Sequence, residues 1–155
     1  MSNQMQLSEG DYQEWYAVAV KELGVHEQPG ADNNKRVQEY FAATSLGPHT
    51  PDSVPWCSAF VNWCFNQCEI VGTDSAAARS WLAWGVPLLR PRVGCVIIFS
   101  RPLGGPASGH VGFLARVPTA TAANVDVLGG NQGDRVCVAP YPTSRILGWR
   151  WPEPK

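Results

Sequence analysis

The chain has 155 residues, of which 45% are hydrophobic and 16% charged, and its formal net charge at pH 7 is −1. This composition excludes a disordered chain and fits one domain of ordinary size. Proteins that bind nucleic acids or anionic membranes usually carry an excess of positive charge, which this chain does not have. No apolar run approaches the roughly 20 residues that a membrane helix needs. We therefore expect no nucleic-acid partner and no membrane insertion.

The N-terminal segment MSNQMQLSEGDYQEW lacks the basic start and the apolar stretch of a secretory signal. We therefore expect synthesis in the cytoplasm without a signal peptide. We also expect one domain over residues 1–155, with residues 1–8 as a flexible N-terminus.

Four helices are predicted in the first half of the chain. Apolar residues at helical spacing predict helices over residues 9–24, 33–43, 56–69 and 75–84. Asn33 or Asn34 can cap the second helix, and Asp74 or Ser75 can cap the fourth, which Gly85 would end.

The second half of the chain is rich in β-branched and aromatic residues. Short runs punctuated by Gly, Pro and Asn predict strands over residues 93–99, 109–117, 124–128, 135–139 and 145–151. Helices followed by strands predict an α+β fold in which an N-terminal helical half packs on a C-terminal antiparallel β-sheet.

The five cysteines are an odd number in a chain without a signal, which argues against a disulfide framework. Cys64 and Cys68 are four residues apart, but no second pair accompanies them and the three histidines are scattered. Structural zinc sites normally show paired short spacings. We therefore expect neither a metal nor a cofactor.

Cys57 begins the third predicted helix, directly after the proline-rich segment 45–55. A helix N-terminus favours an anion, its free N–H groups can face an oxyanion, and a nearby imidazole would lower the thiol pKa and act as base. The alternative is a buried cysteine that packs as a small apolar side chain. That alternative fits the other four cysteines better, so Cys57 is the candidate nucleophile.

His110 begins a predicted strand and has glycines at positions 109 and 112, which leave space around the ring. It is the candidate base, and the alternative is an ordinary surface or core histidine. A base needs an acceptor that orients its second ring nitrogen. The Asn131 amide, after the next strand, can supply that acceptor, or it can belong to a Gly-Gly-Asn turn.

These motifs, in this order, resemble papain-like cysteine hydrolases of the CHAP/NlpC type. They are most similar to a small CHAP-related family found in phage lysins and in bacterial cell-wall-degrading effectors of the type VI secretion kind. The similar segments are PWCSAFVNW at 55–63, ARSWL at 78–82, SGHVGF at 108–113, LGGNQ at 128–132 and LGWR at 147–150. The resemblance extends over about residues 12–152, nearly the whole chain.

The resemblance implies a papain-like fold and a peptidoglycan hydrolase that cleaves an amide bond by a Cys-His-Asn thiol mechanism. Cys57 would be the nucleophile, His110 the general base and then acid, and Asn131 the orienting residue. The bond would be the N-acetylmuramoyl-L-alanine link or one in the stem peptide or cross-bridge. Implied partners are peptidoglycan and, for an effector, a cognate immunity protein. Such an enzyme would act in the periplasm or cell wall after delivery by a secretion system or by phage lysis.

Trp56, Trp81 and Gln132 lie within the similar motifs and are predicted to contact substrate, although tryptophans also serve in cores. The chain departs from its relatives at two positions. Cys95 replaces an aspartate that often opens the strand before the histidine, and Gly129 replaces a glutamate that many CHAP enzymes carry. Because both carboxylates are absent, the sequence does not determine the charge of the cleft or which group orients His110.

Two other function classes fit the same motifs. One is a non-catalytic cell-wall-binding domain on the same fold, against which the retention of all three candidate residues argues. The other is a cytosolic thiol acyltransferase or deamidase, for which release of the acyl group to an amine or alcohol in preference to water would be diagnostic.

Overall fold

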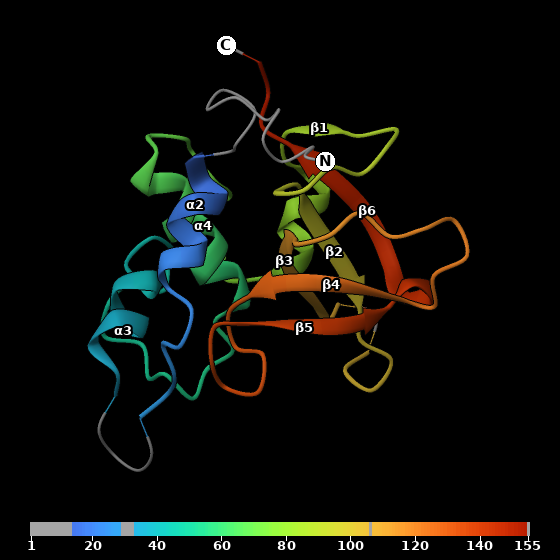
Figure 1. The fold of residues 1–155 in the computed structure, drawn as a ribbon. Coiled ribbons are helices and arrows are strands. Elements are labelled where there is room, and N and C mark those ends of the chain that lie inside the picture. The colour runs from blue at the N-terminus through green and yellow to red at the C-terminus, as the bar shows by residue number, and fades with distance from the viewer. Residues whose placement is uncertain (1–13, 29–32, 106, 155) are drawn as a thin grey trace.

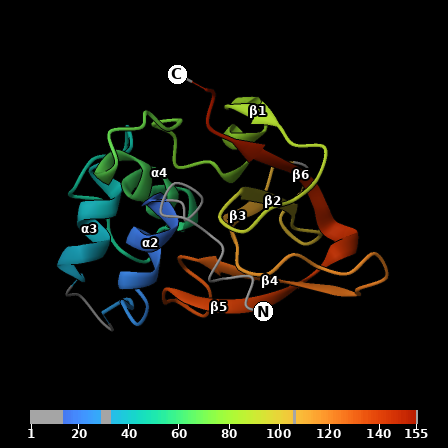
Figure 2. The same cartoon turned by 45° about the horizontal axis from the view of Figure 1, so that its top comes forward.

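The computed structural model describes residues 14–28, 33–105 and 107–154. Helices lie to one side of a six-stranded antiparallel sheet, as Figures 1 and 2 show from two directions. The predicted α+β fold is confirmed. Within the described ranges, no helix is both long and apolar enough to cross a lipid bilayer.

In the described part of the chain, the helical half contains α2 (Glu14–Lys21), α3 (Lys35–Phe41) and α4 (Cys57–Gln67). Of the two candidate caps of α3, Asn34 is the one used, because its side chain accepts hydrogen bonds from the backbone N–H groups of Arg36 and Val37. The start of the predicted helix 9–24 and the predicted flexible residues 1–8 lie outside the described residues.

The fourth predicted helix is a 3₁₀-helix, η1 (Ala78–Ala83), and not an α-helix over 75–84. Asp74 and Ser75 do not cap it: its first flanking residue, Ala77, is extended, and the Ser75 hydroxyl accepts a hydrogen bond from the Ala77 N–H in the preceding turn. Gly85, with a φ of 62°, follows its end as predicted.

The sheet has the strand order β1-β6-β2-β3-β4-β5. Its strands are β1 (Val86–Pro87), β2 (Val96–Ser100), β3 (Gly109–Leu114), β4 (Asn124–Gly129), β5 (Cys137–Pro142) and β6 (Ile146–Trp151). The five predicted strands correspond to β2–β6. β1 was not predicted, because two residues are too few to stand out as a strand pattern.

Both faces of the central strand β2 are buried. Val96 and Ile98 pack in the cluster that contains α4, whereas Ile97 and Phe99 pack in a second cluster on the other face. The strand pairs with β3 in an antiparallel register. That register pairs Phe99 with His110 of β3.

Candidate active site

Cys57 is the first residue of α4, and the residue before it, Trp56, provides no side-chain cap. The first N–H groups of a helix have no partner within the helix. The backbone N–H groups of Cys57 and Ser58 lie close enough to the thiol to lower its pKa by hydrogen bonding. The same groups are therefore placed to stabilise negative charge at this helix end.

Two tryptophans hold the start of α4 in place. The Trp81 indole donates to the Ser58 hydroxyl at 2.8 Å, and that hydroxyl donates to the Ser75 carbonyl at 2.7 Å. The Trp56 indole donates to the Glu27 carboxylate at 3.1 Å. Both rings are fully buried, which fits the alternative of core packing, and their contact with substrate stays a prediction.

His110 is held from both sides of its strand. The Arg79 side chain donates from Nε to the Ser108 carbonyl at 2.7 Å, just before β3 begins. The imidazole stacks on the Tyr141 ring, with 4.7 Å between centroids and 13° between planes. The residue is only 1% exposed, so these contacts fix the plane of the ring.

Gln132 sets the tautomer of His110. The Gln132 amide nitrogen donates to the carbonyls of Val127 at 3.1 Å and Cys137 at 2.8 Å, so its oxygen faces His110 Nε2 at 2.9 Å. Because an amide oxygen only accepts, Nε2 must carry the hydrogen. Nδ1 then has a free lone pair, and it is buried without a partner among the described residues. Nδ1 is therefore the nitrogen that can take a proton.

The structure thus gives the contact with the imidazole to Gln132 and not to Asn131. Asn131 has a φ of 60°, in the left-handed region, within the bend that follows β4, and its side chain makes no hydrogen bond within the described residues. Gln132 is 4% exposed, its amide bonds to His110 and to two backbone carbonyls, and it lines a hollow beside the imidazole, so its contact with substrate stays a prediction.

The lack of a side chain at Gly129 allows the Gln132 amide to reach the His110 ring. A Cβ atom at this position would lie 2.6 Å from Gln132 Oε1 and 3.5 Å from His110 Nε2. The first contact is too short for any side chain, and three interactions hold the Gln132 amide where it is. The glycine that replaces the relatives' glutamate was therefore the available signal for Gln132.

Cys57 and His110 are both uncharged near neutral pH before substrate binds. Burial raises the pKa of Cys57 above its ordinary value, although hydrogen bonding from the Val111 backbone and the charge of Arg101 oppose this. Burial lowers the pKa of His110 to about 4, against the hydrogen bond to Gln132. The expected low thiol pKa at the helix N-terminus is thus wrong, because desolvation outweighs the helix end. The Val111 contact also places the thiol beside the residue that follows His110.

The buried imidazole makes stability depend on pH. Between pH 6.5 and pH 4 an unfolded chain protonates His110 while the folded chain does not, so the free energy of unfolding falls as the pH is lowered through this window. The expected loss is about 3 kcal/mol. Urea unfolding across this range should show a slope that His110→Phe removes. An equal slope in wild type and variant would contradict a neutral buried His110.

A small hollow of about 240 Å³ opens beside the imidazole and is lined by His110, Asn131, Gln132 and Tyr141, among others. Cys57 does not line it and is only 4% exposed. Access of a substrate to the sulfur therefore requires side chains over Cys57 to move.

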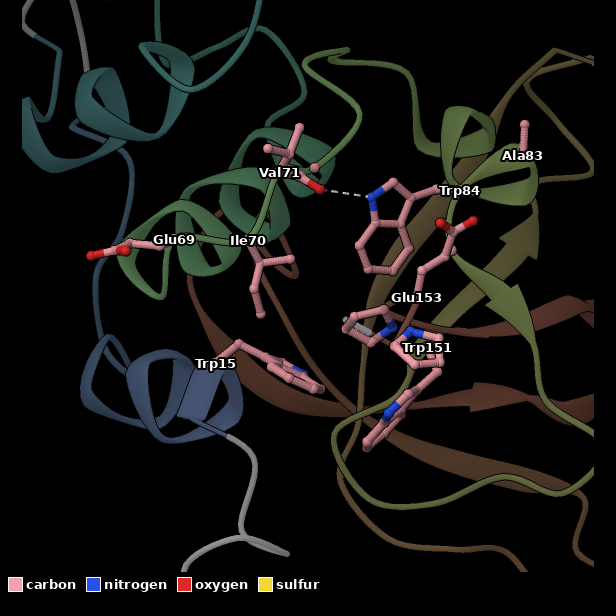
Figure 3. A pocket seen from close by; sticks show the side chains of 12 residues that line it. Trp15, Glu69, Ile70, Val71, Ala83, Trp84, Trp151 and Glu153 are labelled. Atoms are coloured by element: carbon pink, nitrogen blue, oxygen red, sulfur yellow. Dashed lines mark hydrogen bonds between the residues drawn. The ribbon is translucent and has the colours of Figure 1, made fainter.

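A larger pocket, of about 660 Å³, lies elsewhere (Figure 3). Trp15, Trp84 and Trp151 form its walls, and Glu69, just past the end of α4, lines it. Cys57 stands at the other end of that 11-residue helix, roughly 16 Å away along its axis. This larger hollow is thus separate from Cys57 and His110.

Cys95, which replaces the relatives' aspartate, is also away from the pair. It is fully buried in the second core cluster, where burial raises its pKa to about 11. It lies near the end of β2 opposite to Phe99, the residue that pairs with His110. The missing carboxylate therefore changes a core position and not the surroundings of the imidazole.

Comparison of the sequence with known protein families gives a match to the CHAP domain. The CHAP domain matches residues 49–131, which is more than half of the chain and includes Cys57, His110 and Asn131. The match ends one residue before Gln132. Among the curated proteins, none is significantly similar to the chain in sequence. With this match over more than half of its length, on an α+β fold that carries a helix-start cysteine and a strand histidine, the chain belongs to the CHAP domain family.

Proposed function

We propose that this protein hydrolyses an amide bond of peptidoglycan, with Cys57 as nucleophile, His110 as base and acid, and Gln132 as positioning residue. Membership of the CHAP family supports the substrate class and the reaction type. The observation that carries the assignment is the fixed tautomer of His110: Gln132 holds Nε2–H and leaves a buried, unpartnered Nδ1.

The first half of the reaction forms a thioester. As Sγ of Cys57 attacks the carbonyl carbon, Nδ1 of His110 takes the thiol proton, so a low thiol pKa is not required. The backbone N–H groups at the start of α4 stabilise the oxyanion. When the C–N bond breaks, His110 returns the proton to the leaving amine.

The second half releases the acid. His110 takes a proton from water, the hydroxide adds to the thioester carbonyl, and the C–S bond breaks with return of the proton to sulfur. Because His110 must start neutral, its low pKa extends the active range toward acid. We expect kcat/KM to fall only near pH 4, and not near pH 6.5.

The test is digestion of purified peptidoglycan in ¹⁸O-labelled water, with the products identified by mass spectrometry. Hydrolysis predicts fragments that carry a new amine and a new carboxylate with one ¹⁸O atom, and the fragment masses name the bond. Wall binding without fragments would favour the non-catalytic domain. Transfer of the acyl group to an added amine in preference to water would favour the acyltransferase.

A further inference from the structure

Two arginines stand together beside the candidate active site. Arg101 follows β2, and Arg145 ends a short 3₁₀-helix, η2 (Thr143–Arg145), just before β6. The pairing of Phe99 with Ile146 joins these two strand ends, so the arginines extend from neighbouring positions at one edge. Both line the 240 Å³ hollow that contains His110, and both line an adjoining hollow of about 410 Å³.

The two positive charges have no acidic partner. Among the described residues, no salt bridge involves Arg101 or Arg145, and no Asp or Glu lines either hollow. Arg101 donates from Nε to the Gly109 carbonyl at 3.1 Å, which orients its guanidinium and leaves the terminal nitrogens available. Like charges that share a hollow repel each other, so an anion bound between them would be stabilised.

The guanidinium groups of Arg101 and Arg145 favour a carboxylate as the bound anion. A guanidinium presents paired N–H donors that match the two oxygens of a carboxylate, and such bonds are stronger than neutral ones. Arg101 is also close enough for its charge to act on Cys57 and His110. A carboxylate bound there would belong to the same substrate molecule that enters the site.

We propose that Arg101 and Arg145 form a carboxylate-binding subsite next to His110, which selects peptides that carry a free carboxylate near the scissile amide. The inference rests on the proposed function, because peptidoglycan stem peptides carry such groups on D-glutamate, on diaminopimelate and at the terminal D-alanine. The shared chemistry is the free carboxylate, and the test separates its three sources.

The test measures binding and does not need turnover. Titration calorimetry with Cys57→Ala compares one synthetic muropeptide with three analogues, in each of which one carboxylate is a carboxamide. We expect one analogue to bind about 10- to 100-fold more weakly, which identifies the carboxylate that the subsite holds. Adding Arg145→Gln to Cys57→Ala should abolish this difference. Adding Arg101→Lys should retain part of it, because the charge remains.

Arg116→Gln is the matched control, because Arg116 is an exposed arginine away from both hollows. It should leave all four affinities unchanged. Equal affinity for the parent peptide and all analogues, or no binding of any, would overturn the subsite. If the wild type then cleaves peptidoglycan without discriminating between amidated and free forms, the subsite fails and the hydrolase stands. If the affinities differ but the wild type cleaves nothing, the hydrolase fails alone.

Discussion

Replacing Cys57 with alanine is expected to lower the rate of amide hydrolysis by on the order of 10³-fold or more, because no other group can form the thioester. The fold should survive. The substitution removes one buried atom at the first position of α4, and we expect it to cost about 1 kcal/mol of stability. Rates on a muropeptide and urea unfolding of the same preparation measure the two effects.

Cys64→Ala is the matched control for this prediction. Cys64 lies on the same helix and is fully buried, but it is about two turns away from the helix start. Its replacement should cost similar stability and leave the rate unchanged. Equal loss of activity in the two variants would mean that packing of α4, and not the Cys57 thiol, supports the reaction.

Replacing Gln132 with alanine is expected to slow hydrolysis about 100-fold, whereas Asn131→Ala should change the rate less than about threefold. The Gln132 variant leaves the buried His110 Nε2–H without an acceptor and frees the ring to turn or change tautomer. The Asn131 side chain has no such contact. The ratio of the two rates therefore identifies which amide positions the base.

Gln132→Glu separates positioning from structural support. A carboxylate opposite Nε2 favours the charged imidazole and raises the pKa of His110, so the acid limb of kcat/KM should move up from near pH 4. The carboxylate cannot donate to the carbonyls of Val127 and Cys137 as the amide does, so the rate should fall at all pH values as well, and the position of the limb is the readout. An unchanged limb in Gln132→Glu would contradict the assignment.

Most elements of the fold could be predicted from local patterns in the sequence. Runs rich in β-branched and aromatic residues, punctuated by Gly, Pro and Asn, predicted β2–β6, and helical spacing predicted α3 and α4 to within about two residues. The 3₁₀-helix η1 was not predictable in this way, because its geometry depends on contacts outside its own sequence. Its Trp81 reaches Ser58 beside Cys57, and its Arg79 reaches Ser108 before His110.

Cys57 and His110 could be proposed as site residues from the sequence, whereas the residue that contacts the imidazole could not. Cys57 and His110 are marked by their places at a helix start and a strand start. The choice between two adjacent amides depends on which way the chain turns after β4. The left-handed conformation of Asn131 turns the chain, and the space left by Gly129 admits the Gln132 amide. Burial of Trp56 and Trp81 likewise depends on how the helices meet the sheet.

The most direct test of the Cys57–His110–Gln132 unit places wild type, Cys57→Ala, Asn131→Ala and Gln132→Ala side by side on purified peptidoglycan. Fragments are quantified by mass spectrometry over time, with folding of each variant checked by circular dichroism. We predict defined fragments from wild type and Asn131→Ala, slow release of the same fragments by Gln132→Ala, and none from Cys57→Ala. Equal release by folded Cys57→Ala and wild type would contradict a thiol mechanism at this site.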